Sequence, residues 1–468
     1  RTSITAVNAY LIPVINRYLS NLEKYLNRAN LKIMQSNEGY ISSSIAKAEP
    51  IRTSLSGPAG GVVAAFHLGK TTRTRNLITF DMGGTSSDVS LLDGQIRRTN
   101  ESYIGDFPIR MPIIDIHSVG AGGGSIAYLD KGGSLKVGPR SAGAQPGPAC
   151  YGSGEEATVT DANLICGRLV PDFFLGGKMN IYPERSRKAI KKIAGSIGKS
   201  VESTAEGIIE IANSTMEKAI RVISIERGFD PRSFSLCSFG GAGGMHAVDV
   251  ASRLSMTKVI VPKNAGVYSA VGLLLADSIK DTSKSVIKLV DKTEKNELEG
   301  LFLKLTKKSI LDMKKEGFSE HQIKIFPTLD LRYLGQSYEI SIPFKENYAF
   351  DSTFHSAHQK LYSYSHPNRP VEIVNIRIKA VGITKKIRFS KHPPQSPNPL
   401  NALFGEQEFI YNRKTYKSKI YKRSLLKTGN IVPGPALVVD DESTTLLPPG
   451  WILNVDGYLN LFIQRIKE

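Results

Sequence analysis

Hydrophobic residues recur at helical spacing along parts of the chain and alternate with polar residues along others. Residues 5–29 carry an apolar side chain every three or four positions, which predicts a helix that is kinked or begins at Pro13. Similar spacing predicts helices at 56–68, twice within 184–228, and at 245–254, 295–315 and around 354–362. The apolar run 267–276 predicts a buried helix. Short apolar or alternating runs predict strands at 31–34, 77–81, 88–92, 235–239, 258–261, 325–343 and 371–383.

The order of these elements changes along the chain. Strands and helices alternate up to about residue 279, which is typical of an α/β layer architecture. A charged helix and long alternating strands follow, and a linker rich in Pro, Ser and Asn spans 390–402. We therefore expect three domains: an α/β domain at 1–279, an α+β domain at 280–389, and a small β module at 390–468.

Composition narrows the possible classes of protein. The 468 residues include 61 Lys and Arg against 43 Asp and Glu, a formal charge of +18. This charge is spread along the chain, whereas a nucleic-acid binder concentrates it on one face, so we expect no nucleic-acid partner. No apolar run approaches the roughly 20 residues that span a bilayer, so we expect no membrane segment. The three cysteines are far apart and no secretory leader follows Arg1, which suits a cytoplasmic location.

Glycine density marks the first candidate site, since 19 of the 42 glycines fall between residues 57 and 154. Within this part, Asp81-Met82-Gly83-Gly84-Thr85-Ser86-Ser87-Asp88 lies between two predicted strands and indicates a hairpin with a glycine-rich tip. Unobstructed backbone N–H groups at such a tip bind phosphate oxygens. The two aspartates can hold Mg²⁺ through water or orient an attacking oxygen. The alternative is a plain hairpin whose aspartates cap the turn.

A second glycine cluster, Gly240-Gly241-Ala242-Gly243-Gly244, stands between a predicted strand and a predicted helix. Glycines at such a turn let a base or a ribose approach the backbone, and the helix start offers free N–H groups. Tight packing of strand against helix explains the same residues equally well. The combination with the earlier hairpin, about 150 residues away within one α/β unit, is what favours a nucleotide site.

Other residues are candidates for metal binding or nucleophilic chemistry. Asp115 and His117 form an Asp-x-His pair on one side of a strand, and with Asp81, Asp161 and His246 they are the candidate metal ligands. The sequence favours the alternative, in which the histidines hydrogen-bond within packed loops. Cys150 lies in a loop that we expect to be exposed, where a thiol could act as a nucleophile. Cys166 and Cys237 lie in apolar runs and are expected to be buried.

Taken together, the motifs resemble the hydantoinase A and 5-oxoprolinase family along nearly the whole chain. The motifs that carry the resemblance are Ser56 to Val63, Phe80 to Val89, Asp115 to Ser125, Gly138 to Gly143, Pro146 to Gly152, Thr158 to Asn163, Gly240 to His246, Arg332 to Gln336 and Gly434 to Ala436. The resemblance implies an actin-like, sugar-kinase-like ATPase fold of the ribonuclease H type within the α/β domain.

The resemblance also implies an activity: ATP-driven opening of a lactam or hydantoin-type ring, in which the γ-phosphate is placed on the amide oxygen and water attacks the product. It implies ATP and Mg²⁺ as cofactors, with a further divalent metal possible. Phosphate contacts would come from Gly83, Gly84, Thr85 and Ser86, and adenosine contacts from Gly240, Gly241, Ala242, Gly243 and Gly244. The candidate catalytic residues are Asp81, Asp88, Asp115 and His117. The expected partners are a small cyclic amide, a hydantoinase B-like subunit and further copies of the chain.

One feature departs from the family pattern. Members begin with an additional Asp-x-Gly-Gly-Thr hairpin, whereas this chain contains the pattern once, at Asp81 to Thr85, where it matches the second one. We therefore expect the chain to be a fragment, a processed chain or one product of a split gene. Two other functions remain open: an ATP-binding subunit of a ketone carboxylase, and a catalytically incomplete piece that only binds a partner.

Overall fold

The computed structural model describes residues 2–26, 30–99, 102–104, 107–109, 111–345 and 349–466. The chain forms two compact units: unit 1 contains residues 1–54 and 276–386, and unit 2 contains 55–275 and 387–468. Each unit thus joins two separate stretches, whereas the sequence suggested three consecutive domains, and that three-domain division stays a prediction. Within the described ranges, no helix is both long and apolar enough to cross a membrane.

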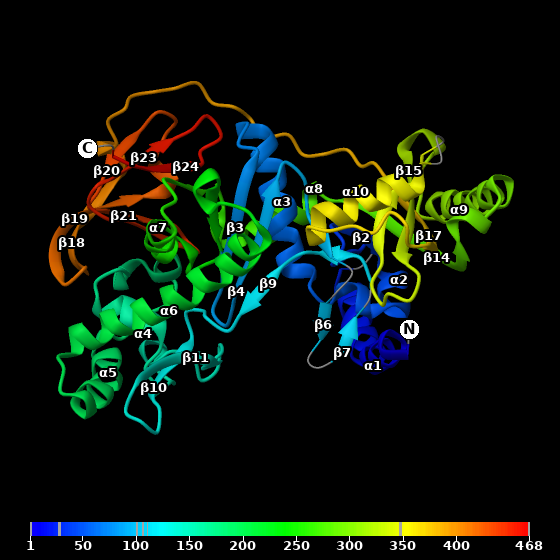
Figure 1. The fold of residues 1–468 in the computed structure, drawn as a ribbon. Coiled ribbons are helices and arrows are strands. Elements are labelled where there is room, and N and C mark those ends of the chain that lie inside the picture. Colours follow the sequence, from blue (N-terminus) through cyan, green and yellow to red (C-terminus); the bar gives the residue numbers. More distant parts are fainter. Residues whose placement is uncertain are drawn as a thin grey trace. The chain divides into compact units, whose positions relative to one another are not determined.

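Unit 1 is built on a six-stranded sheet in the order β1-β2-β14-β17-β15-β16 (Figure 1). All neighbours are antiparallel except β2 and β14, which are parallel. Buried side chains such as Phe302, Tyr333 and Phe354 join two helices to this sheet in one apolar core. The elements of unit 1 are α1 (Thr2–Tyr25), β1 (Lys32–Met34), β2 (Gly39–Ser42), α2 (Ser43–Ala48), β14 (Asp277–Leu289), α9 (Lys295–Lys315), β15 (Ile323–Tyr333), β16 (Ile340–Pro343), α10 (Phe350–Tyr362) and β17 (Val371–Gly382).

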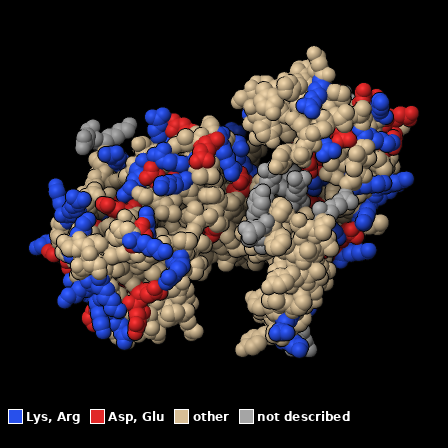
Figure 2. All heavy atoms as spheres, turned by 60° about the horizontal axis from the view of Figure 1, so that its bottom comes forward, with Lys and Arg blue, Asp and Glu red and all other residues tan. Residues whose placement is uncertain are grey.

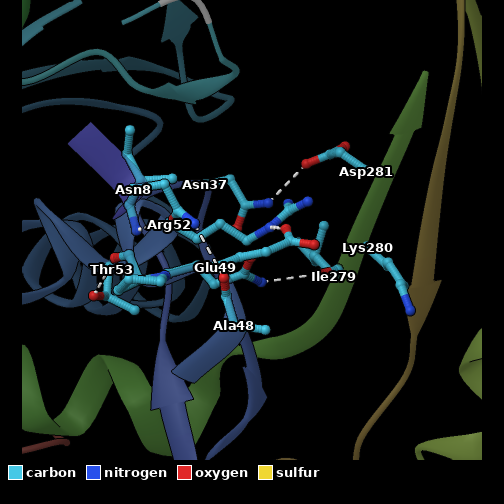
Figure 3. A network of polar contacts seen from close by, with 12 residues as sticks. Asn8, Asn37, Ala48, Glu49, Arg52, Thr53, Ile279, Lys280 and Asp281 are labelled. Carbon is cyan, nitrogen blue, oxygen red and sulfur yellow. Dashed lines mark hydrogen bonds and ion pairs between the residues drawn. The ribbon is translucent and has the colours of Figure 1, made fainter. Parts of the chain in front are cut away.

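A buried polar turn between β1 and β2 fastens the two stretches of unit 1 together (Figure 3). Asn37 donates from Nδ2 to the Asp281 carboxylate at 2.7 Å, and Gln35 donates from Nε2 to the carbonyl oxygen of Ile279 at 2.9 Å. The backbone N–H of Ser36 donates to the carbonyl oxygen of Arg52 at 2.7 Å. Buried polar groups need such partners, so these bonds explain why the first 54 residues pack with β14.

Unit 2 is built on an eight-stranded sheet in the order β20-β23-β24-β13-β12-β3-β4-β9 (Figure 1). Strand β4 runs antiparallel to both of its neighbours, β3 and the edge strand β9. On the other side of β3, strands β12 and β13 continue parallel to it. These strands are β3 (Asn76–Met82), β4 (Ser87–Asp93), β9 (His117–Val119), β12 (Ser235–Phe239), β13 (Lys258–Val261), β20 (Ile431–Pro433), β23 (Trp451–Val455) and β24 (Leu461–Arg465). Because β12 lies beside β3 in parallel, the loops that follow both strands meet at one edge.

In the described part of unit 2, helices α3, α6 and α7 pack on this sheet, and α4, α5 and α8 pack against other helices. They are α3 (Ser56–Thr72), α4 (Val159–Ile165), α5 (Pro183–Ile197), α6 (Val201–Ile223), α7 (Gly243–Arg253) and α8 (Tyr268–Leu275). The backbones of α3 and α8 touch at Gly60 and Gly272, where a side chain on Gly272 would overlap the Gly60 carbonyl. The expectation that α8 is buried was wrong in part: its other face is open, and Leu274 is 61% exposed.

Among the described residues, a four-stranded sheet in the order β18-β19-β21-β22 and three two-stranded sheets, β5-β8, β6-β7 and β10-β11, complete unit 2. The remaining strands are β5 (Arg98–Thr99), β6 (Ser102–Ile104), β7 (Phe107–Ile109), β8 (Ile113–Ile114), β10 (Ser125–Leu129), β11 (Leu135–Ser141), β18 (Leu403–Tyr411), β19 (Lys414–Lys422), β21 (Ala436–Val439) and β22 (Thr444–Leu447). The late β-rich segment expected from the sequence is therefore confirmed, and it contributes strands to both sheets.

Charged side chains of both signs are interspersed on the molecular surface. Figure 2 shows Lys and Arg alternating with Asp and Glu on the face drawn, with extended uncharged areas between them. Ion pairs such as Arg140–Glu156 and Arg187–Glu202 join neighbouring charges at 2.8 Å. Exposed ion pairs of this kind contribute little to the stability of the fold.

Candidate nucleotide site

The β3–β4 hairpin places the two candidate aspartates opposite each other. Asp81 faces Asp88 across the ladder and Met82 faces Ser87, so residues 83–86 form the turn. The N–H of Gly83 donates to the carbonyl oxygen of Ser86 at 3.1 Å, which closes that turn. The hairpin predicted from the sequence is confirmed, and it brings two carboxylates to the base of a glycine-rich tip.

Burial raises the pKa values of both carboxyl groups. Burial, followed by the charge of Asp88, raises the pKa of Asp81 to about 6, while a hydroxyl hydrogen bond of 3.2 Å from Ser269 opposes the shift. Burial also raises the pKa of Asp88, and the hydroxyl groups of Ser118 and Ser86 lower it. A cation that binds between the two carboxylates would favour their ionised forms and lower both pKa values.

A glycine-rich loop at 120–124 supports the tip from one side. Gly123 donates its N–H to the carbonyl oxygen of Gly83 at 3.0 Å, and Gly124 donates to that of Gly84 at 2.6 Å. A side chain on Gly122 would lie 2.8 Å from the carbonyl of Gly84, so no other residue fits there. By contrast, side-chain positions on Gly83 and Gly84 have no atom within 4 Å. The outer face of the tip is open.

The second glycine cluster lies beside the hairpin, at the turn from β12 to α7. Ala242 donates its N–H to the carbonyl oxygen of Met82 at 3.0 Å. Gly240 has a φ of 80°, and a side chain there would lie 2.5 Å from Oδ1 of Asp81. Glycine is required at this position both by its backbone angle and by its closeness to Asp81. The two motifs that the sequence paired are therefore neighbours in space.

A cavity of about 170 Å³ opens between these two motifs. Its lining comes from the hairpin tip, the β12–α7 turn, an aromatic and aliphatic segment at residues 169–175, and the β21–β22 turn, which lies against that segment. Its lining residues are Gly83, Gly84, Gly123, Tyr151, Thr160, Leu169, Val170, Phe173, Phe174, Leu175, Gly241, Ala242, Met245, Val439, Asp440, Glu442, Ser443 and Thr444. Neither the aromatic lining residues nor the β21–β22 turn could be predicted from the sequence pattern. The only available signal for the turn was a polar run between two apolar strands.

Comparison with known proteins shows the family to which the chain belongs. The hydantoinase/oxoprolinase family matches residues 1–282, and the hydantoinase/oxoprolinase C-terminal domain matches residues 288–465. The chain belongs to the hydantoinase/oxoprolinase family. Subunit alpha of caprolactamase from Pseudomonas jessenii is 36% identical over 97% of this chain and 68% of that protein.

Two solved structures share the fold of this family member. The ATP-dependent caprolactamase from Pseudomonas jessenii superposes with a TM-score of 0.85 and 34% identity, covering 99% of this chain and 70% of that one. Nucleotide-free acetone carboxylase superposes with a TM-score of 0.83 and 28% identity, covering 97% of this chain and 67% of that one. The mixed α/β architecture is thus the actin-like ATPase type that the sequence motifs implied.

The structure does not bring the five candidate metal ligands of this family member together. Asp115 forms an ion pair with Arg227, and His117 lies on β9 opposite Val89. Neither residue lines the cavity. Within the described ranges, no group of three or more His, Cys, Asp or Glu side chains could hold a metal ion.

The side chains of Asp161 and His246 are engaged in hydrogen bonds within the protein. The Asp161 carboxylate accepts from the N–H groups of Ala149, Cys150 and Thr158 and from two hydroxyl groups, at 2.6–3.1 Å. His246 is bonded to Asn163 at 3.0 Å and Asn213 at 2.7 Å, and burial lowers its pKa to about 3. Each side chain is already saturated, which leaves no lone pair facing a metal.

The expectation that Cys150 lies in an exposed loop was wrong. Its side chain is fully buried, and burial together with the nearby Asp161 carboxylate raises the pKa of the thiol far above its usual range. A thiol that stays protonated is a poor nucleophile. Cys166 and Cys237 are buried, as predicted.

Proposed function

We propose that this chain is the nucleotide-binding subunit of an ATP-dependent enzyme that opens cyclic amides of the hydantoin, 5-oxoproline or lactam type. One observation carries the proposal: Gly83 and Gly84 of the hairpin tip and Gly241 and Ala242 of the second turn line a single cavity. The named relative and one of the two superposed structures are caprolactamases, and the latter is ATP-dependent, which supports both the nucleotide and the amide.

The residues present fit ATP and Mg²⁺. Gly83 and Gly84 leave open space at the tip, where backbone N–H groups and the hydroxyls of Thr85 and Ser86 can hold phosphate oxygens. Gly241 and Ala242 line the cavity just before α7 and can accept the nucleoside there, whereas Gly240, Gly243 and Gly244 are packed against neighbouring atoms. When bound, ATP would supply a phosphoryl group to the amide oxygen, which converts a poor leaving group into a good one.

Asp81 and Asp88 supply the negative charge that this chemistry requires. Because burial and mutual repulsion raise the pKa of Asp81 to about 6, the ionised pair is destabilised until a cation binds. Binding of Mg²⁺ would therefore offset the unfavourable free energy of ionising the two buried carboxyl groups. The Ser269 hydroxyl fixes the orientation of the Asp81 carboxylate. None of the four candidate catalytic residues lines the cavity, so the catalytic roles of all four stay predictions: Asp81 and Asp88 at the base of the hairpin tip, and Asp115 and His117.

A second candidate function is the ATP-binding subunit of a ketone carboxylase. The likeness to acetone carboxylase favours it, with a TM-score of 0.83. In that reaction the phosphorylated atom would be an enolate oxygen instead of an amide oxygen, and the same hairpin would serve. A third possibility is that the chain only binds a partner. The name of the caprolactamase relative, subunit alpha, supports a hydantoinase B-like partner in each case.

The test is phosphate release by the 468-residue chain mixed with its partner subunit, in the presence of Mg²⁺ and ATP. We expect hydantoin, 5-oxoproline or ε-caprolactam to stimulate release, and Asp81→Asn to abolish the stimulation. Stimulation by acetone with bicarbonate, and by no cyclic amide, would establish the carboxylase function instead. Failure of every substrate, with intact assembly of the two subunits, would favour a partner-binding role.

A further inference from the structure

A buried ion pair connects two segments of unit 2 that line the candidate nucleotide cavity. Arg168 donates from Nη1 to Oδ2 of Asp249 at 2.9 Å, and the two side chains are only 4% and 11% exposed. Leu169 and Val170, which follow Arg168 directly, line the cavity. So does Met245, which lies about one helical turn before Asp249 on α7. The pair therefore joins the segment after α4 to helix α7 close to the point where each reaches the cavity.

The backbone around Arg168 is held by α4 and β18. The N–H of Arg168 donates to the carbonyl oxygen of Asn163 at 2.8 Å, and Gln407 donates from Nε2 to the carbonyl oxygen of Gly167 at 2.6 Å. Gly167 has a φ of 67°, and a side chain there would overlap the carbonyl oxygen of Glu408. These contacts fix the segment on α4 and β18, and the Arg168 side chain adds a connection to α7.

The Asp249 carboxylate is itself held in place from α6 and β18. Asn213 on α6 donates from Nδ2 to Oδ2 of Asp249 at 3.2 Å, and its Oδ1 is 2.7 Å from Nδ1 of His246, one turn earlier on α7. Burial and the charge of Asp249 raise the pKa of Tyr411 well above its usual range, so the hydroxyl stays protonated beside the carboxylate. The guanidinium of Arg168 lies 5.7 Å from the centre of the Tyr411 ring. Arg168 thus binds a carboxylate whose position is already fixed.

Stability alone does not explain a charged pair at this place. Removing two charges from water costs about as much free energy as their attraction returns, and apolar side chains often serve the fold equally well. Nε of Arg168 is also buried and has no hydrogen-bond partner among the described residues, which adds to the cost. A guanidinium–carboxylate bond instead supplies direction, because it forms only over a narrow range of distances and angles. It sets the separation of the two segments that it joins.

We propose that Arg168 is a positioning residue for the nucleoside part of the nucleotide. Acting through Asp249, it fixes the lining segment that begins at Leu169 relative to α7 and to the turn just before that helix. This inference rests on the proposed nucleotide function and deepens it. Nucleoside contacts are assigned to Gly241 and Ala242 of that turn, whereas phosphate contacts are assigned to the hairpin tip. Loss of the pair should therefore weaken binding of the nucleoside and leave binding of the phosphates unchanged.

The experiment titrates ADP and inorganic pyrophosphate, each with Mg²⁺, into the full chain by calorimetry. In Arg168→Met the pair is broken, and we expect ADP to bind about fivefold more weakly while the affinity for pyrophosphate stays within about twofold of the wild type. The matched control is Arg377→Met, which removes one partner of the Arg377–Asp330 ion pair in unit 1, where the aspartate is fully buried. We expect this control to change neither affinity.

A second variant tests the route through the carboxylate. Asp249→Asn keeps the shape of the side chain and removes its charge, so it also provides the test if Arg168→Met does not fold. We expect Asp249→Asn to lose affinity for ADP and to keep its affinity for pyrophosphate. Because Arg168 acts through Asp249, the double variant should bind ADP about as weakly as either single variant.

Each contrary outcome has a distinct meaning. Equal loss of affinity for ADP and pyrophosphate in Arg168→Met, or loss of neither, would overturn the positioning role and leave the nucleotide function intact. Additive losses in the double variant would overturn the route through Asp249. A similar loss of ADP affinity in Arg377→Met would show that general destabilisation is the cause, and would overturn the inference. Absence of binding of both ligands to the wild-type chain would instead overturn the nucleotide function, and the inference with it.

Discussion

Two glycine-rich segments of unit 2 look alike in sequence and differ in their surroundings. At the hairpin tip, Gly83 and Gly84 have open space where a side chain would be. In the supporting loop, side chains on Gly122, Gly123 and Gly124 would lie 2.8–3.0 Å from neighbouring atoms. Gly83 and Gly84 leave space that a ligand can occupy, whereas Gly122, Gly123 and Gly124 allow the loop to pack closely against its neighbours. Glycine density alone marks both, and only the fold separates binding from packing.

The largest expected effect comes from filling one packed position. Gly122→Ala places a methyl group 2.8 Å from the backbone of Gly84 and Ser86, which cannot move without breaking the turn. We expect a loss of about 3 kcal/mol in the free energy of unfolding, the upper part of the range for overpacking. Gly84→Ala, the matched change in open space, should alter stability by less than about 0.5 kcal/mol. Urea denaturation of both variants measures the difference.

A result that breaks the comparison is easy to recognise. Equal free energies of unfolding for the two variants would mean that the loop at 120–124 relaxes away from the tip. The distinction between open and packed glycines would then make no difference to stability. Circular dichroism of each variant before denaturation controls for a general failure to fold.

The next effect concerns the carboxylate below the open tip. Since the pKa of Asp81 rises from 3.8 to about 6 on folding, the native state binds more protons than the unfolded chain between these values. The stability due to the protonated carboxyl is present below pH 3.8 and is lost as the pH rises to 6. Asp81→Asn removes this loss, so at pH 8 we expect the variant to be about 3 kcal/mol more stable and unable to bind Mg²⁺ with nucleotide.

Denaturation at pH 4, 6 and 8 checks this prediction, with Asp441→Asn as the control because that carboxylate is exposed. If Asp81→Asn is less stable than the wild-type chain at pH 8, the carboxylate is stabilising, and the cost that we assign to the ionised pair does not exist.

Much of the fold could be predicted from the sequence, because the signals were local. The β3–β4 hairpin, α9 at Lys295–Lys315 and the strand β12 have periodicity and turn residues that identify them directly. The nature of α8 could not be predicted, since an apolar helix gives no sign that one face is left open. The joining of residues 1–54 to β14 depends on the buried turn at Gln35 to Asn37, a long-range contact that no local pattern indicates.

The candidate site was predictable only in part, for the same reason. The two glycine motifs are each recognisable along the chain, and parallel pairing of β12 with β3 brings them together. The β21–β22 turn at residues 440–443 lies about 200 residues after Gly241, so its place in the cavity follows from the packing of β22 on α7. Cys150 was misjudged because a short loop rich in glycine and proline was taken as exposed, whereas it folds onto the Asp161 carboxylate.

A smaller effect concerns the packed side of the site, where His246 follows Met245 of the cavity lining. Its pKa falls to about 3 in the fold, so only the unfolded chain gains a proton as the pH drops below 6.5. The stability due to the neutral ring is present above pH 6.5 and decreases by about 1 kcal/mol between pH 6 and 5. His246→Gln should show a shallower decrease over this interval. Parallel pH profiles for the two proteins would mean that the histidine titrates normally in the fold.

The central claim is that the open glycines face a nucleotide, and titration of ADP with Mg²⁺ into the wild-type chain and Gly84→Val tests it most directly. The valine projects into the space that we assign to phosphate and touches no other residue at its Cβ. We expect saturable binding by the wild-type chain, with a dissociation constant in the region of 1 mM, or about 4 kcal/mol. Gly84→Val should bind at least tenfold more weakly and have the same stability. No saturable response of the wild-type chain, or equal binding by Gly84→Val, would contradict the account.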